Sequence, residues 1–147
     1  FIGDHRFNDR YPVTISPEHR AARRALFEET LAAVEAVPTE ALDDQRRLSQ
    51  AMFVRLARHQ LEGERFPDDL MPINQFRSAA NSFAMLGSGM SAQPFETVTD
   101  YENFLKRMEG FVAWVDQAIV NMRLGMERGV VQPAILMERT LPQLDAH

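Results

Sequence analysis

The longest regular pattern in this sequence runs from Thr99 to Gly129, and it limits the fold more than any other feature. Within it, apolar residues recur at spacings of three and four: Tyr101, Phe104, Leu105, Met108, Phe111, Val112, Val115, Ala118, Ile119, Met122 and Met126. This spacing predicts one amphipathic α-helix of about 30 residues, roughly 45 Å long. Average helices have only about 11–12 residues, so this helix dominates the predicted fold.

The two ends of the long helix carry their own signals. Thr99 and Glu102 have the spacing of a capping box, in which a threonine and an acidic residue satisfy each other's backbone N–H groups. Gly129 is the residue type that takes the left-handed conformation after a helix. We therefore predict that the helix begins after Thr99 and ends at Gly129.

Three large apolar residues of this helix, Trp114, Val120 and Leu124, lie off the main stripe. Apolar residues on more than one face indicate contacts on two sides. Two interpretations remain: a central helix of a self-contained bundle, or a helix that also docks on protein segments outside these 147 residues. We favour the second.

A first helix is predicted upstream. Ser16, Pro17 and Glu18 form a typical helix start, because serine caps, proline loses nothing at the first position and glutamate suits the positive end. Its apolar stripe continues to about Val37, and Pro38 ends it.

A second helix follows directly. Thr39 is its predicted cap, its apolar stripe runs to about Leu61, and Gly63 and Pro67 close it.

The remaining sequence is less regular but still helical in character. A short helix is predicted over residues 78–86 within an irregular stretch, and a last helix opens at Pro133 and meets a kink or break at Pro142. No convincing strand pattern occurs. We predict an all-α fold, an irregular multi-helix bundle with one long helix near residues 99–129, in which residues 1–147 form a single helical segment.

Composition excludes several classes of function. The chain has 147 residues, a net charge of −5 and no cysteine. The missing cysteines rule out disulfides, thiol nucleophiles and thiolate metal sites. Basic residues form no stripe, which argues against nucleic acid as a partner, and no apolar run approaches the roughly 18 residues needed to span a bilayer.

The histidines do not form a recognisable metal site. His5, His19, His59 and His147 include no pair at i and i+4, so the zinc-binding HExxH helix is absent. His59 and Glu62 share a helix face as in di-iron bundles, but such sites need a second pair and two more carboxylates. Ser88, between two glycines, lacks the elbow that activates a serine. We assign no catalytic, cofactor-binding or metal-binding residue in this chain.

Two polar clusters remain as candidates for binding. Residues 4–6 (Asp-His-Arg) with 8–10 (Asn-Asp-Arg) could form a substrate-binding or hinge loop, or could cap helix ends and pair with each other. For residues 74–77 (Asn-Gln-Phe-Arg) the choice is the same, with buried amide bonds to irregular backbone as the second interpretation. We favour the structural interpretation for both. The eight methionines follow helical spacing, which predicts that they fill gaps in the core.

Four segments, in order, resemble one bacterial family. They are residues 3–10 (GDHRFNDR), 70–76 (LMPINQF), 93–105 (QPFETVTDYENFL) and 116–119 continuing through 125–130 to Pro133. Together they resemble the domain-of-unknown-function 885 (DUF885) family over essentially the whole chain.

This resemblance implies a mostly helical protein that is several hundred residues longer, similar in architecture to Taq-type zinc metallocarboxypeptidases. The chain begins at Phe1 without Met or a cleavable leader, which predicts a truncated start. The resemblance implies that the chain is the N-terminal part of that larger protein. The resemblance places the zinc-binding helix in the C-terminal half, and it implies a peptide substrate and a bacterial cell-envelope or periplasmic location for the whole protein.

Two functional hypotheses follow. In the first, this chain is the N-terminal helical portion of a zinc-dependent metallopeptidase, inactive alone, and its partner is the remaining C-terminal part. In the second, it is a non-enzymatic helical module that binds a partner or forms homo-oligomers through the helix at 99–129. Excess apolar residues on that helix motivate the second hypothesis.

Overall fold

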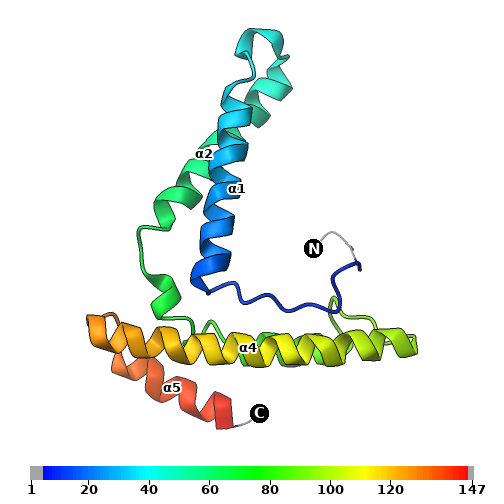
Figure 1. Ribbon diagram of the computed structural model, residues 1–147, viewed down its shortest axis with the longest axis vertical. Helices are drawn as coiled ribbons and strands as arrows, with labels where there is room; N and C mark the ends of the chain where they lie inside the picture. Colours follow the sequence, from blue (N-terminus) through cyan, green and yellow to red (C-terminus); the bar gives the residue numbers. More distant parts are fainter. Residues whose placement is uncertain (1–4, 146–147) are drawn as a thin grey trace. The chain divides into compact units, whose positions relative to one another are not determined.

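The computed structural model describes residues 5–145 and shows an all-α protein (Figure 1). Its elements, in chain order, are α1 (Pro17–Glu35), η1 (Thr39–Ala41), α2 (Asp44–Gly63), η2 (Asp68–Leu70), α3 (Ala79–Gly87), α4 (Val98–Arg128) and α5 (Ala134–Asp145), where η marks a short 3₁₀-helix. No strand occurs among the described residues. The predicted all-α class and the single long helix are both confirmed.

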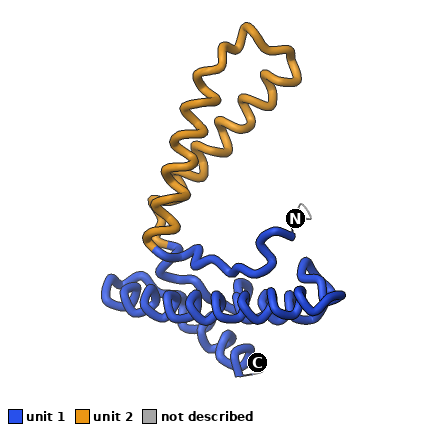
Figure 2. The backbone as a smooth tube through the Cα atoms, turned by 45° about the vertical axis from the view of Figure 1, so that its right-hand side comes forward, with its two compact units in different colours: residues 1–16, 68–147 blue, residues 17–67 orange. Residues whose placement is uncertain are grey.

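The chain divides into two compact units, shown in different colours in Figure 2. Unit 2 comprises residues 17–67, and unit 1 comprises residues 1–16 and 68–147. Each unit has its own pattern of hydrogen bonds and exposed apolar side chains.

Unit 2 is a helical hairpin in which α1 and α2 lie side by side (Figure 1). The Gln50 amide donates to the carbonyl oxygens of Val34 and Val37, at 2.9 Å each, and so satisfies groups at the end of α1. At the other end of the hairpin, the carboxylate of Glu64, the residue directly after α2, accepts from the Arg24 guanidinium at 2.9 Å. These polar contacts join the two helices at both ends.

The cap of α2 differs from the prediction. Thr39 starts the short helix η1, and Asp43 caps α2 by accepting a hydrogen bond from the Arg46 backbone N–H at 2.8 Å. Pro38 stops α1, and the chain needs the extra turn of η1 before it can reverse into α2. Asp43 then supplies both a side-chain acceptor and a negative charge at the positive end of the helix.

The hairpin leaves an apolar face exposed. Ala57 is the only fully buried residue of its two long helices, whereas Leu26, Leu48, Met52 and Leu56 are all more than half exposed. Two helices alone cannot enclose a core, because each has only one neighbour. Unit 2 therefore depends on its polar contacts to a larger extent than a three-helix bundle would.

In unit 1, α4 begins two residues earlier than predicted. Its capping box joins Thr97 and Asp100: the Thr97 side chain accepts from the Asp100 N–H, and the Asp100 carboxylate accepts from the Thr97 N–H at 2.8 Å. Thr99 and Glu102 have the same spacing, but both lie inside the helix, after its cap. The Thr97–Asp100 capping box forms because the Asp100 carboxylate also accepts a hydrogen bond from the Glu96 N–H.

The length and C-terminal end of α4 agree with the prediction. The helix has 31 residues, which corresponds to about 46 Å. Gly129 follows it in the left-handed conformation, with φ of 70°, and its N–H bonds back to the last turn.

The buried face of α4 overlaps the predicted apolar stripe only in part, at Ala118 and along its Phe104 and Phe111 edge. The buried residues are Arg107, Trp114, Ala118, Asn121 and Gly125, while most of the predicted stripe faces solvent. Trp114, which lies off the stripe in sequence, is only 6% exposed. Helical periodicity identifies apolar faces, but it does not say which face the rest of the fold covers.

An aromatic cluster explains which face of α4 the rest of unit 1 covers. Phe83 from α3 stacks on Phe104 and Phe111 of α4, with ring centroids 5.3 and 4.3 Å apart, and Tyr11 meets Phe83 and Phe111 edge-on. Phe111 is half-buried by these contacts. Rings in these geometries stabilise packing beyond their area alone, so they fix α3 and the N-terminal segment on this face.

The short helices behave largely as expected. α3 is capped by Ser78, which accepts from the Asn81 N–H, close to the predicted helix at 78–86. α5 continues through Pro142 to Asp145 instead of breaking there. Proline removes one backbone hydrogen bond near the end of the helix, where few such bonds remain to be lost.

A pH-dependent contribution to stability is expected from Asp100. The Thr97 hydroxyl first, and then the N–H groups of Thr97 and Glu96, lower the pKa of this carboxyl. A lowered folded-state pKa stabilises the protein above the unfolded-state value of about 3.9, and the effect is lost as the pH falls through the folded-state pKa. The loss of thermal stability in D100N should therefore be larger at about pH 6 than below about pH 4.

This prediction is checked by thermal unfolding followed by circular dichroism over that pH range. E102Q is the matched control, because Glu102 is exposed near the same end of α4 but takes no part in the capping box. Equal losses of stability in D100N and E102Q at about pH 6 would contradict the assignment of the cap.

Gly125 permits a close approach of backbone to α4. An added Cβ would lie 2.6 Å from the Val130 carbonyl oxygen and 3.0 Å from that of Leu70. We predict that G125A lowers the free energy of unfolding by about 1–3 kcal/mol, because backbone must move to admit the methyl group. In G63A, the control, the new methyl group meets open space and is expected to be neutral or stabilising by up to about 1 kcal/mol. Urea titration of both variants measures the difference.

Candidate functional site: a methionine pocket and an exposed seam on α4

Arg107 is buried in unit 1 and ties the N-terminal segment to α4. Its guanidinium donates to the carbonyl oxygens of Phe7 at 2.9 Å and Arg10 at 3.1 Å, and to the side-chain oxygen of Gln93 at 2.7 Å. Burial lowers the pKa of the Arg107 guanidinium below its ordinary value, and the charge of Asp9 partly opposes this. Charged hydrogen bonds of this kind are about twice as strong as neutral ones.

Most of the polar cluster predicted at residues 4–10 takes part in the hydrogen bonds around Arg107. Asn8 is buried between the His5 ring nitrogen, at 3.1 Å, and the Arg107 guanidinium, while Asp9 pairs with Arg10 at 3.7 Å. Asp4 lies outside the described residues. The segment therefore contributes hydrogen bonds to the fold, and sequence reasoning did not identify Arg107 as their donor.

Asn121 anchors the irregular backbone in a similar way further along α4. Its amide nitrogen donates to the carbonyl oxygens of Ile15 and Asp69, at 3.0 Å each, and its oxygen accepts from Gln117 at 2.8 Å. Two irregular segments thus meet at one side chain. One feature of the sequence could have identified this buried face of α4. Arg107, Trp114 and Asn121 are spaced by seven residues, which keeps all three on one helix face.

The second polar cluster, residues 74–77, forms a tight turn. The Asn74 side chain accepts from the N–H groups of Phe76 and Arg77, at 2.8 and 2.9 Å. Gln143 on α5 donates to the carbonyl oxygen of Gln75 at 3.3 Å. Amide groups therefore satisfy irregular backbone here, as the favoured interpretation predicts, although the two Asn74 bonds are exposed and not buried.

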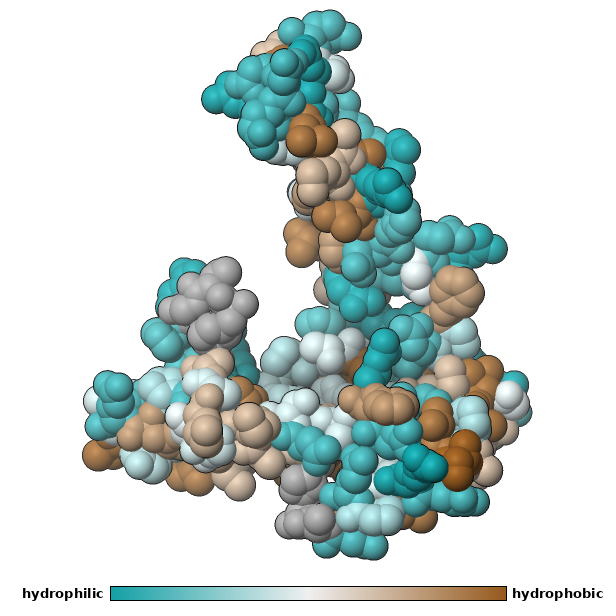
Figure 3. All heavy atoms as spheres, turned by 180° about the vertical axis from the view of Figure 1, so that it is seen from behind, coloured by the Kyte–Doolittle hydropathy of each residue, from teal (hydrophilic) through white to brown (hydrophobic). Residues whose placement is uncertain are grey.

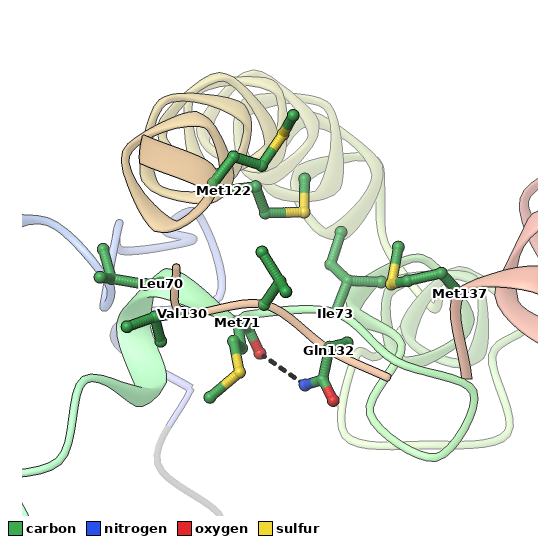
Figure 4. A pocket seen from close by; sticks show the side chains of 9 residues that line it. Leu70, Met71, Ile73, Met122, Val130, Gln132 and Met137 are labelled. Atoms are coloured by element: carbon green, nitrogen blue, oxygen red, sulfur yellow. Dashed lines mark hydrogen bonds between the residues drawn. The ribbon is translucent and has the colours of Figure 1, made fainter. Parts of the chain in front are cut away.

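An open pocket of about 170 Å³ lies near the C-terminal end of α4 (Figure 4). Its lining is apolar apart from one amide. It comes from α4, from the end of η2 and the loop after it, from the segment between α4 and α5, and from α5: Leu70, Met71, Ile73, Met122, Met126, Val130, Val131, Gln132 and Met137. Gln132 donates to the Met71 carbonyl oxygen at 3.5 Å. We call this the methionine pocket.

The methionines are thus not mainly core residues, contrary to the prediction. Four line the pocket, and Met52, Met85, Met90 and Met108 are exposed. Thioether side chains are flexible and polarisable, so a pocket built from them can adapt to apolar groups of different shapes.

The second feature is an apolar stripe along α4, which we call the α4 seam. It comprises Tyr101, Leu105, Met108, Val112, Val115, Ile119, Met122 and Met126. The spacing alternates strictly between four and three, as in coiled coils. Six of the eight are exposed, and Val115 and Met122 are half-buried. Hydrophobic surface also gathers on the face of unit 1 shown in Figure 3.

The seam and the pocket are continuous. Met122 and Met126 are the last two residues of the seam and also belong to the lining of the pocket. One flank of the seam is closed by Phe104, Phe111 and Ala118, which pack within unit 1. The other flank is open to solvent. The seam and the methionine pocket together form one apolar surface, with the pocket at one end.

The residues weighed for metal chemistry or nucleophilic catalysis do not come together. No group of three or more His, Asp or Glu side chains among residues 5–145 could hold a metal ion. His59 is exposed on α2, and His147 lies outside the described residues. The Ser88 hydroxyl closes a turn by donating to the Met85 carbonyl oxygen at 2.8 Å. No helix in the described part of the chain is long and apolar enough to cross a membrane.

The family model described as "Bacterial protein of unknown function (DUF885)" matches residues 1–147, and the chain therefore belongs to this family. No curated protein and no solved structure matches it.

Arg107 should be the most sensitive polar residue of unit 1. We predict that R107M lowers the free energy of unfolding by about 3 kcal/mol, because buried acceptors lose their donor. R123M, which removes an exposed arginine from the same helix, should change it by no more than about 0.5 kcal/mol. Chemical denaturation compares the two variants, and similar values for both would rule out the anchoring role.

Proposed function

We propose that this chain is the N-terminal helical portion of a zinc-dependent metallopeptidase with carboxypeptidase-like activity, and that it is inactive alone. Its family membership and the architecture implied by the four resembling segments support this proposal. The structural observation that supports it best is the exposed α4 seam. Apolar surface of this length normally lies against further protein, here the remaining C-terminal part of the enzyme.

The described residues do not provide the ligands of a zinc site. The proposal therefore places the zinc ligands and the general base outside residues 1–147. Within the complete enzyme this chain would form part of a helical wall, with α4 against the remaining part and the N-terminal segment held to α4 by Arg107.

The test uses the protein expressed from the complete reading frame. We expect about one zinc ion per chain, the usual content of a mononuclear catalytic site, together with hydrolysis of a peptide substrate. A chelator should abolish this activity, and residues 1–147 alone should have none. Elemental analysis and a peptide-cleavage assay measure both properties. A complete protein that binds no zinc, or a reading frame without a zinc-binding helix, would refute the proposal.

A second candidate function is a non-enzymatic helical module that binds a partner or forms homo-oligomers. The same α4 seam favours it, because coiled-coil spacing is typical of helix association. The peptidase assay separates the two candidates, since the second requires neither zinc nor hydrolysis.

A further inference from the structure

The α4 seam has the geometry of one half of a helix–helix interface. From Tyr101 to Met126 it spans about 38 Å at the usual rise per residue. Val112, near its centre, is 59% exposed. The face of α4 next to the seam is already occupied by the aromatic cluster and by the segments held at Arg107 and Asn121. An occupant of the seam would thus meet only this one face.

The spacing of the seam residues indicates that the partner bound there is a helix. A repeat of 3.5 residues keeps facing the same partner only if two helices wind around each other, with side chains of each filling spaces of the other. A strand or an irregular loop has no matching period.

The charges beside the seam indicate what this helix carries. Glu102, Glu109 and Asp116 follow one another at seven-residue intervals along the open flank, all exposed. None of them forms an ion pair within the described residues. In a coiled coil these positions face the flanking residues of the partner helix and govern partner choice. A partner with Lys or Arg at those positions is therefore favoured.

A second copy of this chain fits less well. An antiparallel pair that aligns Tyr101 with Met126 of the second copy would match the two seams end to end. It would set Glu109 beside Asp116 of the second copy and Glu102 beside Arg123 of the second copy, each twice by symmetry. Two repulsive pairs would then cancel two attractive ones, whereas a basic partner would meet all three acidic residues with opposite charge. Like charges at such positions oppose pairing.

The methionine pocket adds an anchor at one end. Its volume of about 170 Å³ is close to that of an engineered apolar cavity in another protein, about 150 Å³, which accepts benzene. One aromatic or large aliphatic side chain of the partner helix would fill it. Such buried anchors commonly dominate the affinity of an interface.

From spacing, charge and pocket together, we propose that the α4 seam binds an amphipathic helix that is not a second copy of this chain. The partner helix carries apolar residues in a heptad repeat, Lys or Arg opposite Glu102, Glu109 and Asp116, and a large apolar side chain that enters the methionine pocket. This inference goes beyond the peptidase proposal and does not depend on zinc or on hydrolysis.

The probe is a fluorescent peptide of four heptads. In each heptad it carries Leu at the two apolar positions that face the seam and Lys at the two positions that flank them. Repulsion between its own lysines keeps it from pairing with itself. A second peptide with Glu in place of Lys is the charge control. Binding to residues 1–147 is followed by fluorescence anisotropy, and circular dichroism verifies that each variant is folded.

Two valines on α4 provide a matched pair for the apolar contact. V112S changes a seam residue that is 59% exposed, and V120S changes one that is 56% exposed but lies off the seam. We expect V112S to weaken binding of the lysine peptide at least tenfold and V120S less than twofold.

A second pair tests the charges. E102K/E109K/D116K should abolish binding of the lysine peptide and should permit binding of the glutamate peptide. E29K/E40K/E138K makes the same change in net charge at exposed residues that are not part of the seam or its flank and should have little effect. Binding should also weaken as salt rises from about 0.05 to 0.5 M, because exposed charges are screened.

Several results would overturn the proposal: no binding of the lysine peptide up to its solubility limit, equal binding of both peptides, or equal effects of V112S and V120S. So would a dimer of residues 1–147, detected by light scattering, that V112S dissociates, because a second copy would then be the occupant. Failure of the zinc and cleavage assays leaves these outcomes unaffected, so the two proposals are tested separately.

Discussion

The hydrogen bonds of the buried Arg107 guanidinium hold the irregular parts of unit 1 to its one long helix. Arg107 joins Phe7, Arg10 and Gln93, and Asn121 joins Ile15 and Asp69 further along α4. The N-terminal segment therefore runs along α4 in the same direction as the helix, as Figure 1 shows. Gly110 allows this, because a side chain there would lie 2.8 Å from the Tyr11 carbonyl oxygen. Backbone without secondary structure must find partners when buried, and α4 supplies them.

This arrangement gives the two faces of α4 different chemistry. The face that carries Arg107, Trp114 and Asn121 combines ring stacking with hydrogen bonds, so it accepts only segments whose carbonyl groups lie at the right places. The α4 seam consists of apolar side chains apart from the hydroxyl of Tyr101, and it can accept any helix of suitable spacing and charge. Specific polar contacts thus fix the fold of unit 1, while the apolar face remains open for association.

The sequence predicted the helices well because their ends carry strong local signals. Pro17 and Gly129 mark boundaries through backbone conformations that few other residues provide, and both were placed correctly. The caps at Thr39 and Thr99 were wrong because several polar residues near each helix start can cap, and only tertiary structure selects Asp43 and Thr97. Local patterns determine that a helix forms more reliably than where its first turn begins.

The candidate site was much harder to predict, for two physical reasons. A charged residue in a helix is usually exposed, so nothing local distinguished the buried Arg107 from the exposed Arg123. Methionines at helical spacing are compatible with a core as well as with an open pocket, and the choice depends on whether another element covers them. The sequence does contain the seven-residue spacing of the polar anchors and the acidic row, but their meaning appears only once the covered face of α4 is known.

The seam also bears on how stable this chain is without a partner. Domains normally enclose their apolar surface between two packed layers, yet α4 has a layer on one side only, and the α1–α2 hairpin exposes Leu26, Leu48, Met52 and Leu56. Covering the seam would remove the remaining exposed area of six apolar side chains from water. Full burial of a side chain of this size contributes about 1.5–3 kcal/mol, and the gain here is a part of that because all six are already partly covered. The cost of fixing a partner helix offsets part of that gain. Association through the seam would thus both stabilise unit 1 and select its partner by charge, two effects of one helix face.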